Sequence, residues 1–272
     1  MKKNLEKCVR CGKCLPHCPS YSYFLQEKYS PRGRNFLLSK DIESTAFDYC
    51  LFCERCQHIC PQGLSFPELF IEKFFLKNSR RLPHIKDPLP FLSFYPSTKK
   101  FIQHWDETKI QDFLWDPLGG DLYLYLSCGT KHLYTGALNR VLHILHDLSI
   151  KVHLPENQDC CGITYLSLKA IENVRKFALN KLQIFSEKKP ILTLCATCFW
   201  MFKKVYPKLF LDTDSAPLFK ELSERTYFIF DFLKENLHYP IELETKSHIL
   251  YHLPCHLRTP LTSEENYLKN IV

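Results

Sequence analysis

The sequence from residue 8 to residue 19 reads Cys8-Val9-Arg10-Cys11-Gly12-Lys13-Cys14-Leu15-Pro16-His17-Cys18-Pro19, with the spacing C-x2-C-x2-C-x3-C-P. The same spacing returns further along the chain at Cys50, Cys53, Cys56, Cys60 and Pro61. Three thiolates two residues apart on a tightly curling backbone can hold three corners of a cubane cluster, while the fourth ligates the other cluster in two-cluster ferredoxins. The repeated spacing therefore predicts two [4Fe–4S] clusters.

The same rule predicts which cysteines belong together. One predicted cluster is held by Cys8, Cys11, Cys14 and Cys60. The other is held by Cys18, Cys50, Cys53 and Cys56. Zinc knuckles or a disulfide framework are the alternatives, but zinc sites usually show two C-x2-C pairs further apart. A run of four cysteines that ends in proline favours iron–sulfur clusters.

The composition predicts a folded chain without a membrane span. Hydrophobic residues make up 45% of 272 positions, enough for a sizeable core in one or two domains. No stretch approaches the roughly 18 uncharged apolar residues that span a bilayer, and Met1 to Lys7 lacks the apolar region of a secretory signal. We therefore expect the fourteen cysteines to be metal ligands in a reducing cytoplasm. Contact with the inner membrane face is expected only through partners.

Charge and glycine content exclude several function classes. The formal net charge of +7 counts cysteines as neutral, and two clusters held by thiolates bring it to about +3. The lysines are scattered, without a basic stripe interleaved with aromatic residues, so we expect no nucleic-acid binding. None of the eight glycines belongs to a phosphate-binding loop. A flavin or nicotinamide used in the reaction is therefore expected on another chain.

Residues 1–78 are predicted to form a helical, ferredoxin-like domain with two [4Fe–4S] clusters. Between its cysteine runs, Ser30 and Pro31 are the residue types of a helix N-cap and a first helical position, so we expect a helix there and not a β-hairpin. Arg32 and Arg34 follow. Either they lie near a cluster and raise its reduction potential, or they belong to a solvated helix end.

Two segments follow the second cysteine run. Phe66 to Leu76 has apolar residues at helical spacing and predicts a helix that packs into the core. Residues 79–120 contain repeated prolines, which interrupt regular structure. They predict a proline-rich connector between domains, with a short helix near Thr98 to His104.

From Asp121 the pattern changes to strands that alternate with helices, which predicts a parallel α/β layer over residues 121–240. The predicted strands are 122–126, 150–154, 191–194 and 247–251, and the predicted helices are 138–148, 171–185, 199–206 and 227–237. Cysteines follow the carboxyl ends of the strands, where ligand sites of open α/β sheets collect. These candidate metal ligands are Cys128, Cys160, Cys161, Cys195, Cys198 and Cys255. Buried core cysteines are the alternative.

These cysteines also carry a resemblance. Cys128-Gly129, Cys160-Cys161-Gly162 and Cys195-x2-Cys198 resemble the cysteine-rich "CCG" module of heterodisulfide reductases and of the iron–sulfur subunits of glycolate oxidase, lactate oxidation complexes and anaerobic glycerol-3-phosphate dehydrogenase. The ferredoxin part, including Ser30 to Arg34, resembles the same group, and the glycolate oxidase iron–sulfur subunit is the closest overall pattern. The resemblance implies an α + α/β fold, in which a helical two-[4Fe–4S] ferredoxin-like domain precedes an α/β CCG domain.

The resemblance changes near the end of the sequence. Tyr251 to Leu257 resembles the opening of a second CCG module, which family members usually complete. Here the sequence stops 17 residues after Cys255, without a second CCG or a second C-x2-C. We therefore expect residues 241–272 to be the start of an incomplete second module, because the protein is naturally short, its gene is split or the sequence is truncated.

The resemblance leaves open what the first module holds. In heterodisulfide reductases it implies a third, noncubane [4Fe–4S] cluster bound by five cysteines, whereas in other relatives the site holds zinc or one ordinary cluster. Thiolates suit iron clusters and zinc alike, but five cysteines exceed the four ligands of a tetrahedral zinc site. An iron–sulfur cluster is favoured, and zinc or an empty structural site are the alternatives.

Three functions follow as hypotheses. The resemblance favours an electron-transfer subunit of an oxidoreductase complex, which is not catalytic alone. It would take electrons from a partner FAD-binding dehydrogenase for glycolate, lactate or a similar 2-hydroxy acid and pass them to a quinone, a membrane-associated acceptor or another carrier. The second hypothesis is heterodisulfide reductase-like catalysis at the CCG site, and the third is a zinc-ordered scaffold whose clusters sense redox state.

Overall fold

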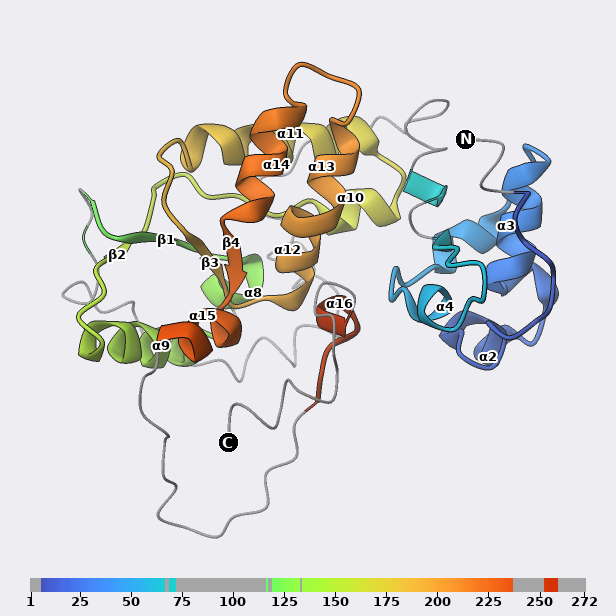
Figure 1. Ribbon diagram of the computed structural model, residues 1–272, viewed down its shortest axis with the longest axis horizontal. Coiled ribbons are helices and arrows are strands. Elements are labelled where there is room, and N and C mark those ends of the chain that lie inside the picture. Colours follow the sequence, from blue (N-terminus) through green and yellow to red (C-terminus); the bar gives the residue numbers. More distant parts are fainter. Residues whose placement is uncertain are drawn as a thin grey trace, which may run out of the picture.

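The computed structural model describes an N-terminal and a C-terminal part of the chain. The described residues are 6–66, 69–71, 116, 119–132, 134–236 and 252–258. Short helices make up the N-terminal part, and the C-terminal part is a small parallel sheet between helices (Figure 1). The chain is therefore a mixed α/β protein, as the pattern of strands and helices predicted.

Short helices lie between and beside the two cysteine runs. They are α2 (Pro19–Phe24), α3 (Pro31–Ser39) and α4 (Arg55–His58), with 3-10 helices at Glu27–Tyr29 and Thr45–Tyr49. The predicted start of α3 is confirmed, because Pro31 opens the helix and the Ser30 hydroxyl accepts a hydrogen bond from the Gly33 amide at 2.9 Å. A Cβ on Gly33 would lie 1.9 Å from the Glu27 carbonyl oxygen, so only glycine lets α3 approach the preceding turn.

Four parallel strands form the sheet, in the order β2-β1-β3-β4. Their bounds are β1 (Leu122–Tyr125), β2 (Val152–His153), β3 (Ile191–Thr193) and β4 (Thr226–Phe228). Every residue of β1 is buried, as expected for a parallel strand covered on both faces. The strand order reverses between β1 and β3, and ligands collect at such switch points in open α/β sheets.

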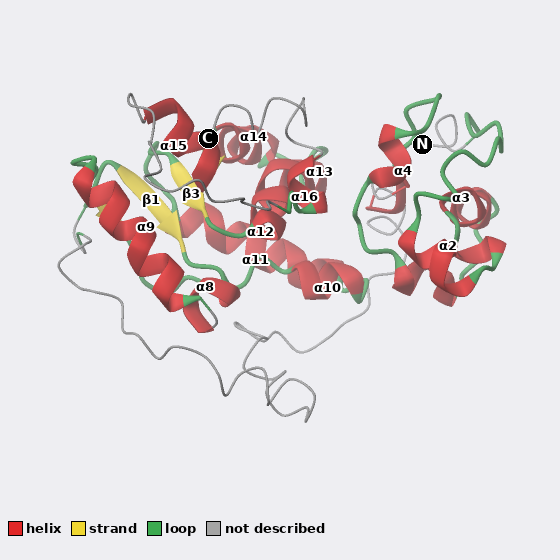
Figure 2. Ribbon diagram, turned by 90° about the horizontal axis from the view of Figure 1, so that it is seen from below, coloured by secondary structure: helices red, strands yellow, loops and turns green. Residues whose placement is uncertain are grey.

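Helices cover both faces of the sheet (Figures 1 and 2). The helices α9 (Thr135–Asp147) and α15 (Ile229–Asn236) lie on one face, where their apolar side chains pack with Leu122 and Leu124. Tyr123 and Tyr125 point to the other face and pack with α11 (Ile171–Ile184). The remaining helices are α8 (Cys128–His132), α10 (Ile163–Ser167), α12 (Ala196–Trp200), α13 (Tyr206–Leu209), α14 (Ala216–Glu224) and α16 (Cys255–Arg258).

A π-helical turn joins α12 to α13 and spans Met201–Val205. Pro207 comes two residues later, and a proline ring clashes with the carbonyl four residues before it in an α-helix. The wider π turn relieves that clash and lets the helix continue. Trp200 before the turn and Tyr206 after it are both buried.

One apolar core joins the N-terminal and C-terminal parts. It includes Phe47 and Phe52 of the N-terminal part and continues to Trp200. The rings of Phe52 and Trp200 lie 6.1 Å apart. Across the same boundary, Lys169 Nζ pairs with Asp48 Oδ1 at 2.7 Å. The two parts therefore pack directly against each other.

One predicted helix needs correction. The helix expected over 227–237 begins as a strand, because Thr226–Phe228 pair with β3 and only Ile229–Asn236 are helical. Thr, Tyr and Phe suit a strand, but the segment is short and its apolar spacing also matches the helix that follows. The strand at 247–251, the helix near 98–104 and most of the connector at 79–120 lie outside the described residues.

Candidate metal centres

Two groups of cysteines line separate cavities in the N-terminal part. The inner cysteine set is Cys18, Cys50, Cys53 and Cys56, and all four line one cavity of about 330 Å³, counting space open to solvent. The outer cysteine set is Cys8, Cys11, Cys14 and Cys60. Three of its members line a second cavity of about 320 Å³, which Cys56 also borders, and Cys11 is exposed. The structure thus places all four cysteines of the inner set around one cavity and three of the outer set around the other, whereas Cys11 is not among the residues that line them.

An arginine borders each cavity. Arg34 lines the cavity of the inner cysteine set and is only 2% exposed. Its Nε donates to the Ala46 carbonyl at 2.8 Å and its Nη1 lies 3.8 Å from Cys18 Sγ, but its Nη2 bonds to none of the described residues. Arg32 borders the outer cavity and is paired with Glu27 at 2.6 Å. Arg34 is therefore a buried charge beside the cysteines and not part of a solvated helix end.

Burial opposes ionisation of the thiols in both sets. It raises the pKa of Cys50 to about 11, although the Arg34 guanidinium acts in the opposite direction. Burial also raises the pKa of Cys53, Cys56 and Cys14. Thiolates at these positions therefore need a bound cation to balance their charge.

The five-cysteine site of the C-terminal part lies at the carboxyl edge of the sheet, around the switch point. Cys128 follows β1, Cys160 and Cys161 follow β2, and Cys195 and Cys198 follow β3. Their thiols form a hydrogen-bonded series in the order Cys128, Cys160, Cys161, Cys198, Cys195. The structure thus unites all five cysteines that the sequence predicted to converge.

The thiols of the five-cysteine site divide into donors and acceptors. Hydrogen bonds from Cys160 and Cys198 lower the pKa of Cys161, and the bond from Cys198 lowers the pKa of Cys195 to about 6. The hydrogen bonds that Cys198 makes with Cys161 and Cys195 raise the pKa of Cys198 itself. The hydrogen bond from Cys128 lowers the pKa of Cys160. The hydrogen bond to Cys161 and burial act more strongly in the opposite direction, so the pKa of Cys160 rises to about 12. Thiolates at Cys161 and Cys195 prepare the site for a cation.

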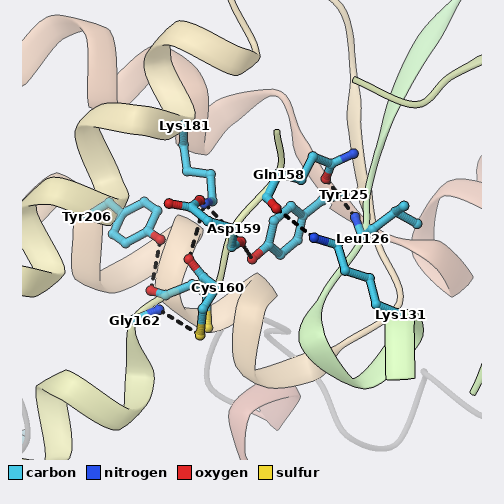
Figure 3. A network of polar contacts seen from close by, with 10 residues as sticks. Tyr125, Leu126, Lys131, Gln158, Asp159, Cys160, Gly162, Lys181 and Tyr206 are labelled. Carbon is cyan, nitrogen blue, oxygen red and sulfur yellow. Dashed lines mark hydrogen bonds and ion pairs between the residues drawn. The ribbon is translucent and has the colours of Figure 1, made fainter. Parts of the chain in front are cut away.

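Buried side chains hold the backbone that presents Cys160 and Cys161 (Figure 3). Lys181 Nζ donates to the carbonyls of Asp159 and Cys160, each at 3.1 Å, and pairs with the Asp159 carboxylate. The Tyr125 hydroxyl donates to the Asp159 carbonyl at 2.7 Å, and the Tyr206 hydroxyl donates to the Cys161 carbonyl at 2.9 Å. The carbonyls of three consecutive residues are therefore fixed by buried side chains, which orients the thiols.

Sequence reasoning missed this support. One signal was present, because helical spacing from Val174 and Ala178 places Lys181 on the core face of α11. A lysine at a core position is rarely buried unless it is paired. The structure also explains why glycine occupies position 162. The φ of Gly162 is +81°, and a Cβ there would lie 3.0 Å from the Phe177 ring.

The sixth candidate ligand, Cys255, opens α16. Burial raises the pKa of Cys53, and the Cys255 thiol adds to this effect, so Cys255 lies near the inner cysteine set. The next residue, His256, stacks on Trp200 with ring centroids 4.9 Å apart. A ligand role for Cys255 stays a prediction.

Known family models match both parts of the chain. A model described as a 4Fe-4S dicluster domain matches residues 4–64, and one described as a cysteine-rich domain of the CCG type matches residues 122–203. The chain joins a 4Fe-4S dicluster domain to a cysteine-rich domain. The dicluster domain contains both cysteine runs and binds two [4Fe–4S] clusters, as their spacing predicted. The cysteine-rich domain contains the five-cysteine site, whose chemistry suits a third cluster.

Several curated relatives are named as oxidoreductase subunits or as iron–sulfur proteins. The chain is 22% identical to a subunit of the fumarate reductase (CoM/CoB) of Methanothermobacter marburgensis, over 94% of this chain and 52% of the relative. It is 22% identical to a subunit of the dihydromethanophenazine:CoB--CoM heterodisulfide reductase of Methanosarcina mazei, over 93% of this chain and 69% of the relative. The probable glycolate oxidase iron–sulfur subunit of Bacillus subtilis is 38% identical, over 25% of this chain and 18% of the relative.

These relatives are matched over only part of their own length. The chain spans about half the length of several of the curated relatives it matches, as 52% of the fumarate reductase relative shows. No solved structure matches the chain significantly. In the described stretches, no helix is both long and apolar enough to cross a bilayer.

The residues fit the clusters that the dicluster domain implies. Arg34 is buried without a carboxylate partner among its described contacts, and a buried charge normally requires a partner. A [4Fe–4S] cluster on four thiolates carries a charge of about −2 and would supply one beside Cys18. Among the described residues, no three His, Cys, Asp or Glu side chains lie close enough to hold a single bare metal ion.

Proposed function

We propose that the outer cysteine set holds one [4Fe–4S] cluster, the inner cysteine set the other, and the five-cysteine site a third iron–sulfur cluster. The cavities of the two sets and the hydrogen-bonded thiols at the sheet edge support this assignment. The domain bounds proposed from the sequence are 1–78, 79–120, 121–240 and 241–272. With these bounds, the two cubane clusters belong to the first domain and the five-cysteine site belongs to the third. When bound, the clusters supply one-electron redox chemistry, and the chain supplies ligands, hydrogen bonds and burial.

We propose further that the protein is the electron-transfer subunit of an oxidoreductase complex. A partner FAD-binding dehydrogenase for a 2-hydroxy acid such as glycolate or lactate would donate electrons, and a quinone or another acceptor would receive them. The observation that carries this proposal is the packing of the inner cysteine set beside the cysteine-rich domain, which puts three candidate redox sites in one molecule. The probable glycolate oxidase iron–sulfur subunit of Bacillus subtilis supports the choice of partner.

The metal content tests the cluster assignment first. The protein is purified anaerobically, and iron, acid-labile sulfide and zinc are counted per chain. About 12 iron atoms without zinc are expected from three clusters. About 8 iron atoms with one zinc would instead support a zinc-ordered scaffold.

A partner assay tests the role. The loaded protein is mixed with a candidate flavoprotein and its 2-hydroxy acid, and bleaching of the cluster absorbance is followed. Reduction that requires both flavoprotein and substrate is expected. Protein that stays oxidised although dithionite reduces its clusters would contradict the proposed partner.

The extent of the heterodisulfide reductase match favours a second candidate function. That relative aligns over 93% of this chain, whereas the glycolate oxidase relative aligns over 25%. The alternative is cleavage of a disulfide substrate at the five-cysteine site, with two electrons and two protons yielding two thiols. A change in the spectrum of the five-cysteine site on adding a thiol substrate would favour this alternative.

A further inference from the structure

The dicluster domain and the cysteine-rich domain are in contact at a point that is close in sequence to a candidate ligand in each domain. Glu54, which follows Cys53 of the inner cysteine set, accepts a hydrogen bond at its Oε1 from Trp200 Nε1 at 3.1 Å. Trp200 itself comes two residues after Cys198 of the five-cysteine site. Glu54 and Trp200 are 2% and 1% exposed. A buried contact therefore lies directly beside ligands of both proposed clusters.

The contact continues from Trp200 to the five-cysteine site through α16. The Trp200 ring stacks on His256 at 4.9 Å between centroids and an interplanar angle of 18°. His256 Nδ1 lies 2.9 Å from the Thr197 hydroxyl, and Thr197 lies between Cys195 and Cys198 in the sequence, both of which belong to the five-cysteine site. We call Glu54, Trp200, His256 and Thr197 the aromatic bridge. Figure 1 shows α16 beside α12, on the side that faces the dicluster domain.

We propose that the aromatic bridge is the route by which electrons cross from the inner cysteine set to the five-cysteine site. In each step, the reduced cluster of the inner set loses one electron and the five-cysteine group gains it, so no bond breaks and no proton is required. Tunnelling falls off steeply across empty space and less steeply through bonds, hydrogen bonds and stacked rings. A continuous series of close contacts between the two ligand groups therefore favours this route. The inference rests on the proposed electron-transfer function.

The same domain boundary offers a matched control. Lys169 pairs with Asp48 at 2.7 Å, so this ion pair also holds the domains together. Lys169 Nζ also lies 5.6 Å from the centroid of the Phe47 ring, and neither Asp48 nor Phe47 belongs to the aromatic bridge. Asp48→Asn loosens the boundary without touching the proposed route, whereas Trp200→Leu removes the ring that links Glu54 to His256. Trp200→Phe keeps a ring for the stack and loses the Nε1 donor.

The test measures the internal transfer rate directly. The loaded chain is photoreduced anaerobically by a flash, and freeze-quenched EPR spectra follow the electron from the cubane signals to the five-cysteine site. Trp200→Leu is expected to slow this transfer about tenfold or more, Trp200→Phe less, and Asp48→Asn not measurably. Iron content and the reduction potentials of all sites should match the wild type, so that neither lost metal nor a changed driving force explains the rate.

Each other outcome has one meaning. An unchanged rate in Trp200→Leu, with electrons still reaching the five-cysteine site, would overturn the aromatic bridge and leave the proposed function intact. A wild-type chain in which no electron reaches that site would overturn both. If Trp200→Leu does not fold, His256→Gln keeps a polar partner for Thr197 and removes the ring, and a wild-type rate in that variant would overturn the bridge as well.

Discussion

Arg34 places a buried positive charge beside the inner cysteine set. It is buried, and Nη1 lies 3.8 Å from Cys18 Sγ. Reduction adds negative charge to the cluster, and a nearby guanidinium stabilises that charge. Arg34→Gln should therefore lower the reduction potential of the cluster at the inner cysteine set, on the order of 50 mV. An EPR redox titration measures the shift.

Arg32 provides the comparison for this substitution. It borders the outer cavity but is already paired with Glu27, so Arg32→Gln should shift the other cluster by less. Arg34→Lys keeps the charge and should restore most of the potential. A potential that does not move in Arg34→Gln would contradict the assignment of the inner cysteine set.

Cys195 makes the stability of the metal-free protein depend on pH. Its pKa is about 6 in the folded chain, against 9.0 for the free thiol. A depressed pKa contributes stability that is fully present above the unfolded value and is lost as the pH falls through the folded value. The free energy of unfolding of wild type minus that of Cys195→Ser should therefore rise between pH 6 and pH 9, by about 3 kcal/mol.

Urea unfolding of the reduced, metal-free proteins at several pH values measures this difference. Thr193→Val, a buried substitution on β3 before the site, serves as a control, because it removes no ionisable group. A difference between wild type and Cys195→Ser that stays constant with pH would show that Cys195 is not a thiolate in the folded apoprotein.

The candidate ligands can be recognised in the sequence, but the side chains that support them cannot. The cysteines are recognisable by their spacing, because cluster geometry fixes how the backbone must present them. Tyr125, Lys181 and Tyr206 act through hydroxyl and ammonium groups that reach carbonyls far away in sequence. No local pattern records such a contact, and only the burial of a lysine on a core face hinted at it.

Among the secondary structure elements, α3 holds the arginines against both cavities, and its position depends on Gly33. A Cβ at residue 33 would lie 1.9 Å from the Glu27 carbonyl oxygen, which is backbone and cannot rotate away. Gly33→Ala should therefore push α3 outward, destabilise the dicluster domain by roughly 2–3 kcal/mol and reduce its iron content. Thermal unfolding and iron analysis measure both effects. Gly119→Ala is the control, since a Cβ there meets open space.

Elements with a single strong signal were predicted well, and those with competing signals were not. Ser30 and Pro31 mark the start of α3 by capping chemistry alone. Strand β4 is different, because only pairing with β3 separates Thr226–Phe228 from the helix that follows. Such pairing is a tertiary effect, and propensity over three residues is too weak to reveal it.

In the whole molecule, the two proposed clusters of the dicluster domain differ in exposure. Cys11 of the outer cysteine set is exposed, whereas the inner cysteine set lies beside the boundary with the cysteine-rich domain. A membrane-impermeant oxidant or chelator should therefore remove the outer cluster first. EPR spectra recorded during the treatment should lose one cubane signal before the other, and simultaneous loss would contradict this order.

The shared apolar core also sets an order of events during synthesis. Phe47 and Phe52 leave the ribosome long before Trp200, the ring that covers Phe52. At about 5–20 residues per second, the newborn dicluster domain stays uncovered on that side for roughly ten to thirty seconds. During this interval its cysteines are accessible and its phenylalanines are exposed to aggregation. Iron delivery and chaperone binding are thus expected to act on the same nascent surface, before the rest of the chain arrives to close it.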